Sequence, residues 1–325
     1  GTQPTVTDAD LVLGYLDASF FLGGKMKLDV EAARRAIQTQ IAEPLGLSVE
    51  EAAWGIHQVA NENMANAARV HTLERGKDPH RFPLFAFGGA GPVHAYRVAL
   101  ALGSPLLIAP FGAGVMSTVG FLVAPLAFDF VRSWHSKLAT LDWTKANTLL
   151  SGMEAEGEEV LIASGVDRAQ IHHRRQADMR YVGQGHEVRV TLPGHSLSAT
   201  DAEAIQAEFE QTYRQLYGRF GPPVPLELIN WRVISSGPTP DLHLQTANLN
   251  AGNADFSCKG SRRAWFPEAK AYVDTPIYDR YRLAVGAHFH GPAIVEERES
   301  TVIVGQQGRC HIDQQRNLVV EIEER

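Results

Sequence analysis

The sequence predicts a mixed α/β chain in which an α/β layer is followed by an α+β region. A buried strand, a glycine-rich turn and a helix follow one another twice, within residues 82–102 and again within 106–123. After residue 135 the pattern changes to long helices separated by strands of alternating polarity, an arrangement typical of α+β structure. The length of 325 residues also favours two domains, since a typical domain holds ~150 residues.

Two helices are expected before the first strand. Residues 29–43 begin with Asp29, whose side chain suits the N-cap of a helix. Residues 48–76 begin with Ser48 and Glu51 at the spacing of a capping box and end at a glycine. Apolar residues recur at helical spacing along this second segment, which predicts a long amphipathic helix.

The two strand–turn–helix cycles predict the α/β layer. Residues 82–87 form a short apolar run without polar alternation, which indicates a buried strand. The glycine turn 88–92 ends this run, and Pro92 suits the first turn of a helix that extends to Leu102. The second cycle has its strand at 106–109, its turn at 110–114, its helix at 115–123 and a closing strand at 126–134.

The remaining chain is expected to form the α+β region. Residues 237–255 are rich in Pro, Thr, Asn and Gly, as is typical of a linker. The predicted domains are therefore 1–135 and 136–325, with a β-rich lobe from about residue 241. The elements expected before the linker are helices at 142–164 and 202–217 and strands at 176–182, 187–192 and 226–234.

Composition and charge exclude several classes of protein. A formal net charge of −7 without a basic block argues against a nucleic-acid partner. No apolar run approaches the ~18 residues that a membrane span needs, so no membrane partner is expected. Two cysteines cannot build a disulfide framework, and no signal peptide is recognisable, which predicts a cytoplasmic protein. The chain begins with Gly1 rather than methionine, and we interpret it as a piece of a longer polypeptide.

The strongest local signal for a binding site is the glycine turn formed by Gly88, Gly89, Ala90 and Gly91. Glycines between a buried strand and a helix let the backbone approach a ligand, and the helix N-terminus offers free N–H groups. The alternative is a tight connection that binds no ligand. A second glycine turn at 111–117 follows the next strand, and the two turns would line one crevice at the carboxyl edge of the sheet.

Two further positions are candidates for catalysis or metal binding. Asp8 lies in the stretch 5–10, which holds two hydroxyls and two carboxylates, a composition suited to magnesium. The alternative is that Thr7 or Asp8 caps a helix. His94 lies in the first turn of the helix behind the glycine motif, where it would reach a bound phosphate or substrate. Its alternative is a structural role.

Other polar clusters predict no chemistry. His57 and His71 lie too far apart for one helical face, and His172 and His173 would point to opposite sides of a strand. The sequence therefore does not predict a zinc site. No G-x-S-x-G motif is present, and neither cysteine lies at a helix start, so a nucleophilic serine or cysteine has no support.

Seven segments, spread in order along nearly the whole chain, together carry a resemblance to a known family. They are PTVTDADLVLG at 4–14, FLGG at 21–24, ERGKDPHRFPLFAFGGAGPVHA at 74–95, PFGAGVMSTVGFLVAP at 110–125, MRYVGQGHEVRV at 179–190, FEQTYRQLYG at 209–218 and GPAIVEERESTVIVGQQG at 291–308. In these segments the chain resembles the C-terminal portion of the hydantoinase A/5-oxoprolinase family. The D-x-G-G-T-type phosphate loop of the family has no match here, so the catalytic phosphate loops lie outside this chain.

The resemblance implies the second lobe of an actin-like, sugar-kinase-like (ribonuclease-H-like) ATPase fold over about residues 1–135. It also implies that Gly88, Gly89, Ala90 and Gly91 contact nucleotide on its adenosine side. Asp8 would follow the second phosphate-binding region and lie near phosphate or magnesium. ATP and magnesium are the implied cofactors, and both would require the missing N-terminal half.

The function implied by the resemblance is ATP-dependent opening of a cyclic amide such as hydantoin or 5-oxoproline, with a B-type partner subunit. Phosphorylation of an oxygen turns it into a far better leaving group, and phosphoryl transfer is catalysed mainly by positioning and charge neutralisation. Asp8 and His94 are the catalytic candidates. The alternatives are an ATP-dependent ketone carboxylase subunit and a catalytically silent scaffold that docks the partner subunit.

Overall fold

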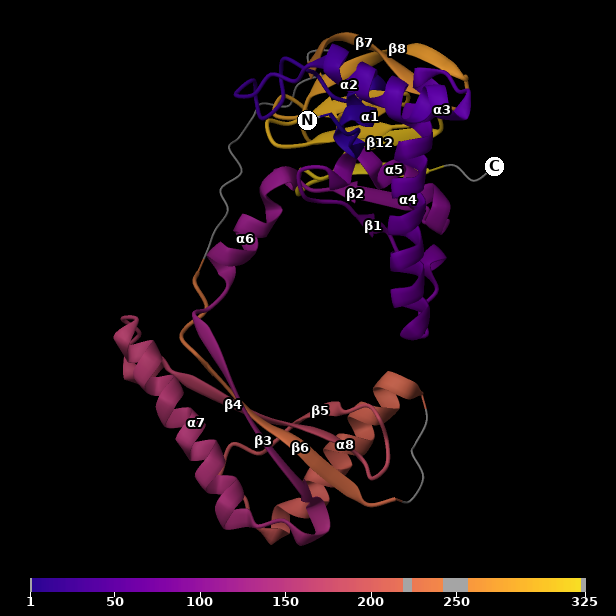
Figure 1. The fold of residues 1–325 in the computed structure, drawn as a ribbon. Helices are drawn as coiled ribbons and strands as arrows, with labels where there is room; N and C mark the ends of the chain where they lie inside the picture. The colour runs from indigo at the N-terminus through magenta and orange to yellow at the C-terminus, as the bar shows by residue number, and fades with distance from the viewer. Residues whose placement is uncertain (1, 219–223, 242–256, 323–325) are drawn as a thin grey trace. The chain divides into compact units, whose positions relative to one another are not determined.

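The helices and strands sort into two units in the computed structural model, which describes residues 2–218, 224–241 and 257–322 (Figure 1). Unit 1 contains the described residues of Gly1–Gly120 and of Leu244–Arg325, and unit 2 contains those of Phe121–His243. Unit 1 is therefore built from two segments that are far apart in the sequence. Among the described residues, no helix combines the length and the apolar character needed to cross a membrane.

The helices of unit 1 begin at the predicted caps. Asp29 accepts from the Ala32 amide, and Ser48 and Glu51 form the capping box. The first helix instead begins after Thr5, because Thr5 and Asp8 form a capping box of their own. The helices are α1 (Val6–Val12), α2 (Val30–Ile37), the π-helix η1 (Gln38–Ala42), α3 (Glu43–Leu45), α4 (Val49–Glu74), α5 (Gly91–Leu102), α6 (Met116–Val123) and the 3-10 turns η2 (Pro79–Arg81) and η3 (Ala113–Val115).

The first sheet of unit 1 contains strands from both predicted strand–turn–helix cycles and extends beyond them. β1 (Leu84–Phe85) and β2 (Leu106–Ala109) run parallel, with α5 as their connection. The other edge of β2 pairs antiparallel with β13 (Leu318–Ile322), because an unpaired edge leaves backbone groups that need partners. The sheet continues through β12 (Gly308–Ile312) to β9 (His288–His290). The C-terminal strands thus complete the α/β layer.

A second sheet of unit 1 also packs against α5. Its order is β11-β10-β8-β7, with β10 parallel to β8 and the other pairs antiparallel. Tyr96 and Ala99 of α5 share one buried cluster with residues of both sheets. The N-terminal helices α1, α2 and α4 bury their apolar faces with Phe266 and Ile294 of this sheet. Its strands are β7 (Cys258–Phe266), β8 (Ala271–Asp279), β10 (Ala293–Glu296) and β11 (Thr301–Val304).

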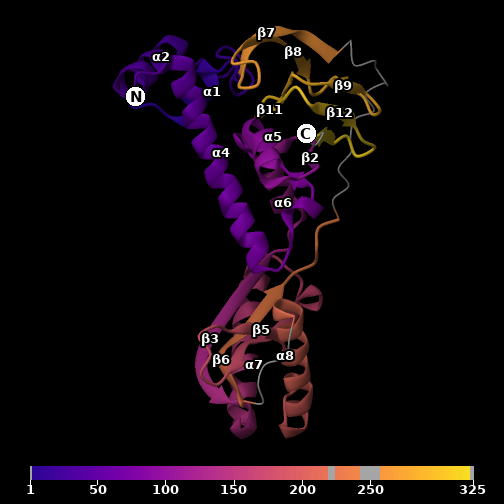
Figure 2. The same cartoon turned by 90° about the vertical axis from the view of Figure 1, so that its right-hand side faces the viewer.

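Unit 2 is a four-stranded antiparallel sheet in the order β3-β6-β4-β5. Helices α7 and α8 contribute to one buried cluster with the strands, so both cover the same face of the sheet (Figure 2). The elements are β3 (Ala127–Lys137), η4 (Leu138–Thr140), α7 (Trp143–Ala163), η5 (Arg168–Gln170), β4 (His172–Tyr181), β5 (Val188–Thr191), η6 (Ala199–Asp201), α8 (Ala202–Tyr217) and β6 (Leu226–Ser236).

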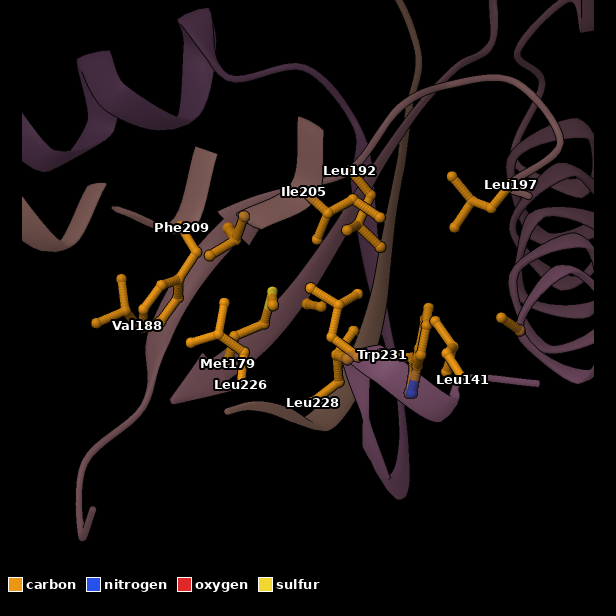
Figure 3. Packing of buried hydrophobic residues seen from close by; sticks show 14 of the residues in the cluster. Leu141, Met179, Val188, Leu192, Leu197, Ile205, Phe209, Leu226, Leu228 and Trp231 are labelled. Carbon is orange, nitrogen blue, oxygen red and sulfur yellow. The ribbon is translucent and has the colours of Figure 1, made fainter. Parts of the chain in front are cut away.

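A bulge in β6 explains why both halves of this strand reach the core of unit 2. Asp178 lies opposite Asn230, but the next residue, Met179, lies opposite Leu228. The intervening residue has no partner, and this shift turns both Leu228 and Trp231 toward the same face. Both are fully buried among the side chains of α7, α8 and β5 (Figure 3).

Most predicted elements form, but the units differ from the predicted division of the chain. The strand expected at 126–134 is β3, and it pairs with β6 in unit 2 rather than closing the first layer. The strands expected in a separate terminal lobe belong to unit 1, because β13 pairs with β2. The predicted linker 237–255 lies outside the described residues from position 242 onward. The structure confirms a mixed α/β chain with three sheets.

Candidate functional site

A cavity of about 210 Å³ lies in unit 1 against the glycine turn that the sequence predicts to bind a ligand. Gly89 and Ala90 line it, whereas Gly88 and Gly91 flank these two residues in the turn. Asp10 of α1 lines another side. The remaining walls come from the loop after α1, within 16–22, and from the connection between β10 and β11.

The backbone of the turn is shaped for close approach. Gly88 has a φ of +94°, which side chains rarely adopt, and its amide donates to the Ala113 carbonyl at 2.8 Å. A Cβ on Gly89 would meet only the Glu299 carbonyl, at 3.6 Å. Helix α5 starts directly after Ala90, and no side chain caps it. Pro92 has no amide hydrogen and the Val93 amide donates to the Ala90 carbonyl at 3.2 Å, so among the first three residues of α5 only Gly91 offers an amide to a ligand.

The second glycine turn supports the first one. The bond from Gly88 to Ala113 joins the two turns, as the parallel pairing of their strands leads one to expect. The Gly112 amide donates to Oε1 of Glu297 at 3.0 Å. Residues of this second turn do not line the cavity in the part of the chain that the structure describes. The second turn thus positions a carboxylate of the cavity wall.

The cavity is rich in negative charge. It is lined by one guanidinium, that of Arg298, and by the carboxyl groups of Asp10, Asp17, Glu296, Glu297 and Glu299. Burial raises the pKa of Glu297, while Arg280 and the Gly112 amide oppose this rise. A bare polyphosphate would be repelled by these groups. The cavity therefore suits a nucleoside, a neutral ring or a cation better than a chain of phosphates.

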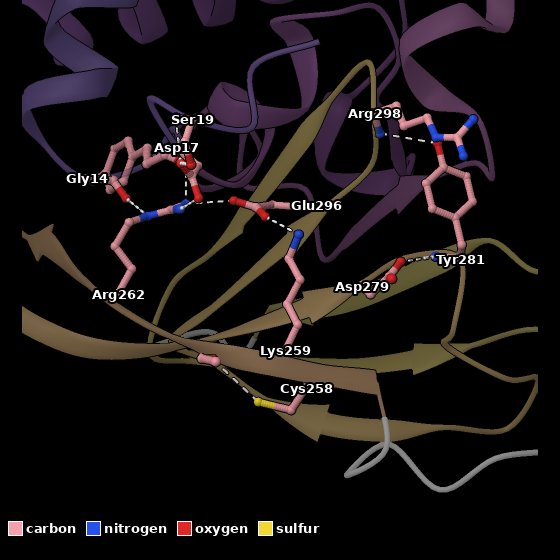
Figure 4. Close-up of polar contacts among 12 residues, drawn as sticks. Gly14, Asp17, Ser19, Cys258, Lys259, Arg262, Asp279, Tyr281, Glu296 and Arg298 are labelled. Carbon is pink, nitrogen blue, oxygen red and sulfur yellow. Dashed lines mark hydrogen bonds and ion pairs between the residues drawn. The ribbon is translucent and has the colours of Figure 1, made fainter. Parts of the chain in front are cut away.

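An ion-pair network holds the acidic wall in place (Figure 4). The Glu296 carboxylate lies 2.6 Å from Lys259 Nζ and accepts from Arg262 Nη2 at 2.9 Å. Arg262 also donates through Nε to the Gly14 carbonyl at 2.8 Å and lies 3.4 Å from Asp17. Strand β7 is thereby tied to the end of α1 and to β10. Because Glu296 is neutralised by two cations, it serves mainly to fix the wall.

A buried polar cluster lies behind the cavity, where α1, α4 and α5 meet. His57 Nδ1 and Asp10 Oδ1 are 2.7 Å apart, and His94 Nε2 and Asp10 Oδ2 are 3.6 Å apart. His94 Nδ1 is hydrogen bonded to Asn61 Oδ1 at 2.8 Å. The imidazole rings of His57 and His94 stack with their centroids 4.5 Å apart. All four residues are at most 4% exposed, so the cluster is an enclosed polar site.

The predicted catalytic candidates occupy different environments. Asp8 Oδ2 accepts from the amide and the hydroxyl of Thr5, at 2.8 and 2.7 Å. It lines a separate surface cavity with Asp29, not the one at the glycine turn. The structure therefore does not bring Asp8 and Gly89 to one cavity. His94 is 3% exposed and faces Asn61 and Asp10, so it lies behind the cavity wall.

Sequence reasoning missed the partners of His94. Asp10 lies in the acidic stretch that the sequence indicated for magnesium, but only Asp8 was favoured there. His57 was compared with His71 on its own helix, and spacing along one helix says nothing about two other helices. The sequence offers one signal for this cluster. His57 and Asn61 are four residues apart on the same helix, so their side chains share one face.

Comparison with known families identifies the chain. The family model described as hydantoinase/oxoprolinase matches residues 1–130, and the model described as hydantoinase/oxoprolinase C-terminal domain matches residues 143–322. The chain belongs to the hydantoinase/oxoprolinase family. This confirms the resemblance that its motifs carry, and the second model alone covers more than half of the chain.

Named members of the hydantoinase/oxoprolinase family are similar over nearly all of this chain. The caprolactamase subunit alpha of Pseudomonas jessenii is 33% identical over 96% of the chain and 45% of its own length. The acetophenone carboxylase gamma subunit of Aromatoleum aromaticum is 32% identical over 96% of the chain and 44% of its own length. The chain thus spans less than half the length of these relatives, which are subunits of larger enzymes.

Solved structures of the hydantoinase/oxoprolinase family share the fold. A nucleotide-free acetone carboxylase, described as carrying out ATP-dependent acetone carboxylation, superposes with a TM-score of 0.75 and 27% identity over 98% of this chain and 46% of its own. The ATP-dependent caprolactamase from Pseudomonas jessenii gives 0.72 and 31% over 100% of this chain and 47% of its own. The family therefore includes ATP-dependent enzymes of two reaction classes.

Proposed function

We propose that this chain is the C-terminal part of an ATP-dependent A-type subunit that opens a cyclic amide of the hydantoin or 5-oxoproline type. The observation that carries the proposal is the cavity against Gly89 and Ala90 at the start of α5. In the proposal, unit 1 supplies the second lobe of an actin-like ATPase fold. The chain is similar to an ATP-dependent caprolactamase, whose name indicates that it acts on a lactam. Because a lactam is a cyclic amide, this similarity supports the opening of a cyclic amide.

The residues of the cavity fit the nucleoside part of a nucleotide better than its phosphates. The open side of Gly89 suits the face of a nucleoside. The carboxylates around it disfavour phosphate. Bound ATP would supply the phosphoryl group that activates the amide oxygen. In this proposal the chain forms the nucleoside half of the site, and the phosphate loops come from the rest of the protein.

Magnesium fits less well at the predicted position. One oxygen of Asp8 already accepts two hydrogen bonds from Thr5, as expected for a helix cap. Its second oxygen is left for a cation, and magnesium is usually held by only one or two carboxylates together with water and phosphate. Asp8 thus remains a candidate for magnesium only where phosphate approaches α1 from outside the cavity of the glycine turn.

A ketone carboxylase is the second candidate reaction. It is favoured by the 32% identity with the acetophenone carboxylase gamma subunit and by the TM-score of 0.75 with acetone carboxylase. Both candidate reactions use ATP to activate an oxygen of a carbonyl group. The named relatives work as subunits, so in either case we propose a B-type partner subunit that completes the active site.

Nucleotide binding tests the first part of the proposal. We expect the whole subunit that contains this chain to bind Mg-ADP saturably in a calorimetric titration and Gly89→Val to abolish that binding. The substitution is compatible with folding, because a Cβ at Gly89 meets only one atom, at 3.6 Å. Gly55→Ala is the control, since its Cβ would meet nothing within 4 Å. Equal affinities of wild type and Gly89→Val, with unchanged circular dichroism, would contradict a nucleotide at the turn and favour the scaffold.

Product analysis separates the two reactions. The subunit that contains this chain, together with its partner subunit and ATP, is incubated with a cyclic amide or with a ketone and labelled bicarbonate. We expect a ring-opened product from the amide and no label in a carbon-bound carboxylate. Incorporation of label into the ketone product would assign the chain to the carboxylases instead.

A further inference from the structure

We propose that Asp10, His57 and His94 form a binding site for one divalent transition metal ion of the zinc type. Each residue offers one ligand atom, and these three atoms all lie within 4.8 Å of one another. The set of two imidazole nitrogens and one carboxylate oxygen is typical of zinc and related first-row metals, and unlike the all-oxygen sets that magnesium prefers. This site is independent of the nucleotide proposed at the glycine turn.

The distances within the cluster fit a shared metal. Bonds of 2.0–2.2 Å in a tetrahedral arrangement place neighbouring ligand atoms about 3.4 Å apart. The two observed separations, 2.7 Å from His57 Nδ1 to Asp10 Oδ1 and 3.6 Å from His94 Nε2 to Asp10 Oδ2, lie on either side of this value and involve the two different oxygens of the carboxylate. Separating His57 Nδ1 from the Asp10 carboxylate by about 0.7 Å would let one ion bond to all three side chains.

The hydrogen bonds of the cluster leave room for a cation. With Asn61 Oδ1 as its acceptor, His94 Nδ1 carries the proton, and the Nε2 lone pair then faces Asp10 Oδ2. The separation of 3.6 Å is too long for a hydrogen bond, so none joins His94 Nε2 to Asp10 Oδ2 directly. A metal ion between them would bond to both atoms.

The charge and the burial of the cluster also favour a bound cation. Asp10 is 3% exposed, and a buried carboxylate needs an opposite charge or a metal. Arg97 is engaged by both oxygens of Glu268 and does not pair with Asp10. His57 Nε2 is buried and has no hydrogen-bond partner among the described residues.

The surroundings also suit a metal site. The bond from His94 Nδ1 to Asn61 would fix the ring, as outer partners of metal-binding histidines commonly do. Asp10 lines both the cluster and the cavity at the glycine turn, which gives an ion a path of entry. A bound metal would link α1, α4 and α5 directly behind that cavity.

Metal binding by the purified chain tests the proposal. After removal of metal with a chelator, the chain is titrated with Co²⁺, whose visible absorption reports a four-coordinate site, and then with Zn²⁺. We expect one equivalent of each to bind and Zn²⁺ to displace Co²⁺. His57→Gln and Asp10→Asn should abolish the absorption, and Asn61→Leu should weaken binding by about 10- to 100-fold. His71→Gln, an exposed position on the same helix, is the matched control.

The outcomes distinguish a metal from a hydrogen-bonded core. The proposal is supported if added Zn²⁺ raises the melting temperature of wild type and His71→Gln but not of folded His57→Gln. The Asp10→Asn variant keeps the shape of the side chain, and circular dichroism checks its fold. The proposal is overturned if wild type binds no more Co²⁺ than His57→Gln, or if Zn²⁺ leaves its melting temperature unchanged. In that case Asp10 and His57 form a buried hydrogen-bonded pair.

Discussion

At the scale of single residues, tertiary contacts rather than local sequence patterns decide which acidic and histidine side chains lie together. The glycine turn was recognisable because the feature is local, a strand followed by glycines and a helix. The cluster of Asp10, His57 and His94 was not, because each residue comes from a different helix and only packing brings them together. The role of Asp8 was also hard to predict. Its hydrogen bonds to Thr5 depend on α1 beginning after Thr5, and the sequence pattern did not place the start of the helix there.

Gly14 is a residue where a contact makes glycine necessary. It has a φ of +75°, and a Cβ there would lie 2.2 Å from the Arg263 carbonyl of β7. We expect Gly14→Ala to lower the free energy of unfolding by about 3 kcal/mol, measured by urea denaturation. Gly46→Ala is the matched control, because its φ is +67° with nothing within 4 Å. It should cost only about 1 kcal/mol. Equal losses would mean that strain alone, and not the contact with β7, matters.

Glu297 is expected to make stability depend on pH. Burial raises the pKa of its carboxyl in the folded chain. As pH rises from about 4, the unfolded chain therefore loses this proton first, and stability falls until pH passes the folded-state pKa. Glu297→Gln stays neutral, so its stability relative to wild type should increase between low and neutral pH. Urea denaturation at several pH values measures this difference. Parallel curves for the two proteins would contradict the raised pKa.

At the scale of elements, the sequence predicts helices and strands well where caps and periodicity are strong. The capping box of Ser48 and Glu51 and the helix 202–217 formed as expected, because both signals depend only on neighbouring residues. Pairing partners were harder to predict. β3 was expected in the first layer but pairs with β6, and β2 takes β13 as a partner from the far end of the chain. Strand pairing depends on contacts that no local pattern encodes.

The packing of α7 on its sheet gives a test at this scale. Gly157 of α7 faces β6 so closely that a Cβ would lie 2.1 Å from Ser235 Oγ. We expect Gly157→Ala to separate helix and sheet and to lower the stability of unit 2 by about 2 kcal/mol. Gly152→Ala on the same helix meets nothing within 4 Å and should raise stability by up to about 1 kcal/mol. Thermal denaturation of both variants checks the prediction, which fails if the two substitutions have effects of the same sign.

At the scale of the whole molecule, the two units differ in how the chain builds them. Unit 2 is continuous, whereas unit 1 needs the C-terminal strands to complete the sheet that begins with β1 and β2. The cavity at the glycine turn therefore combines a wall from the N-terminal segment with the acidic wall 296–301. The family resemblance extends over nearly the whole sequence, but the sequence alone does not reveal that the N-terminal and C-terminal segments of unit 1 line one cavity.

This construction predicts that damage near the C-terminus reaches the glycine turn. Val320 is fully buried and lies opposite Leu107 of β2, so Val320→Asp places an unpaired charge in the core of unit 1. We expect a loss of about 4 kcal/mol and, in hydrogen exchange, lost protection of β2 and α5 while β4 and β6 stay protected. Glu321→Asp at the exposed neighbouring position should leave exchange unchanged. If Val320→Asp left β2 protected, the first sheet of unit 1 would not depend on the C-terminal strands for its stability. If β4 and β6 lost protection with it, the two units would fold as one.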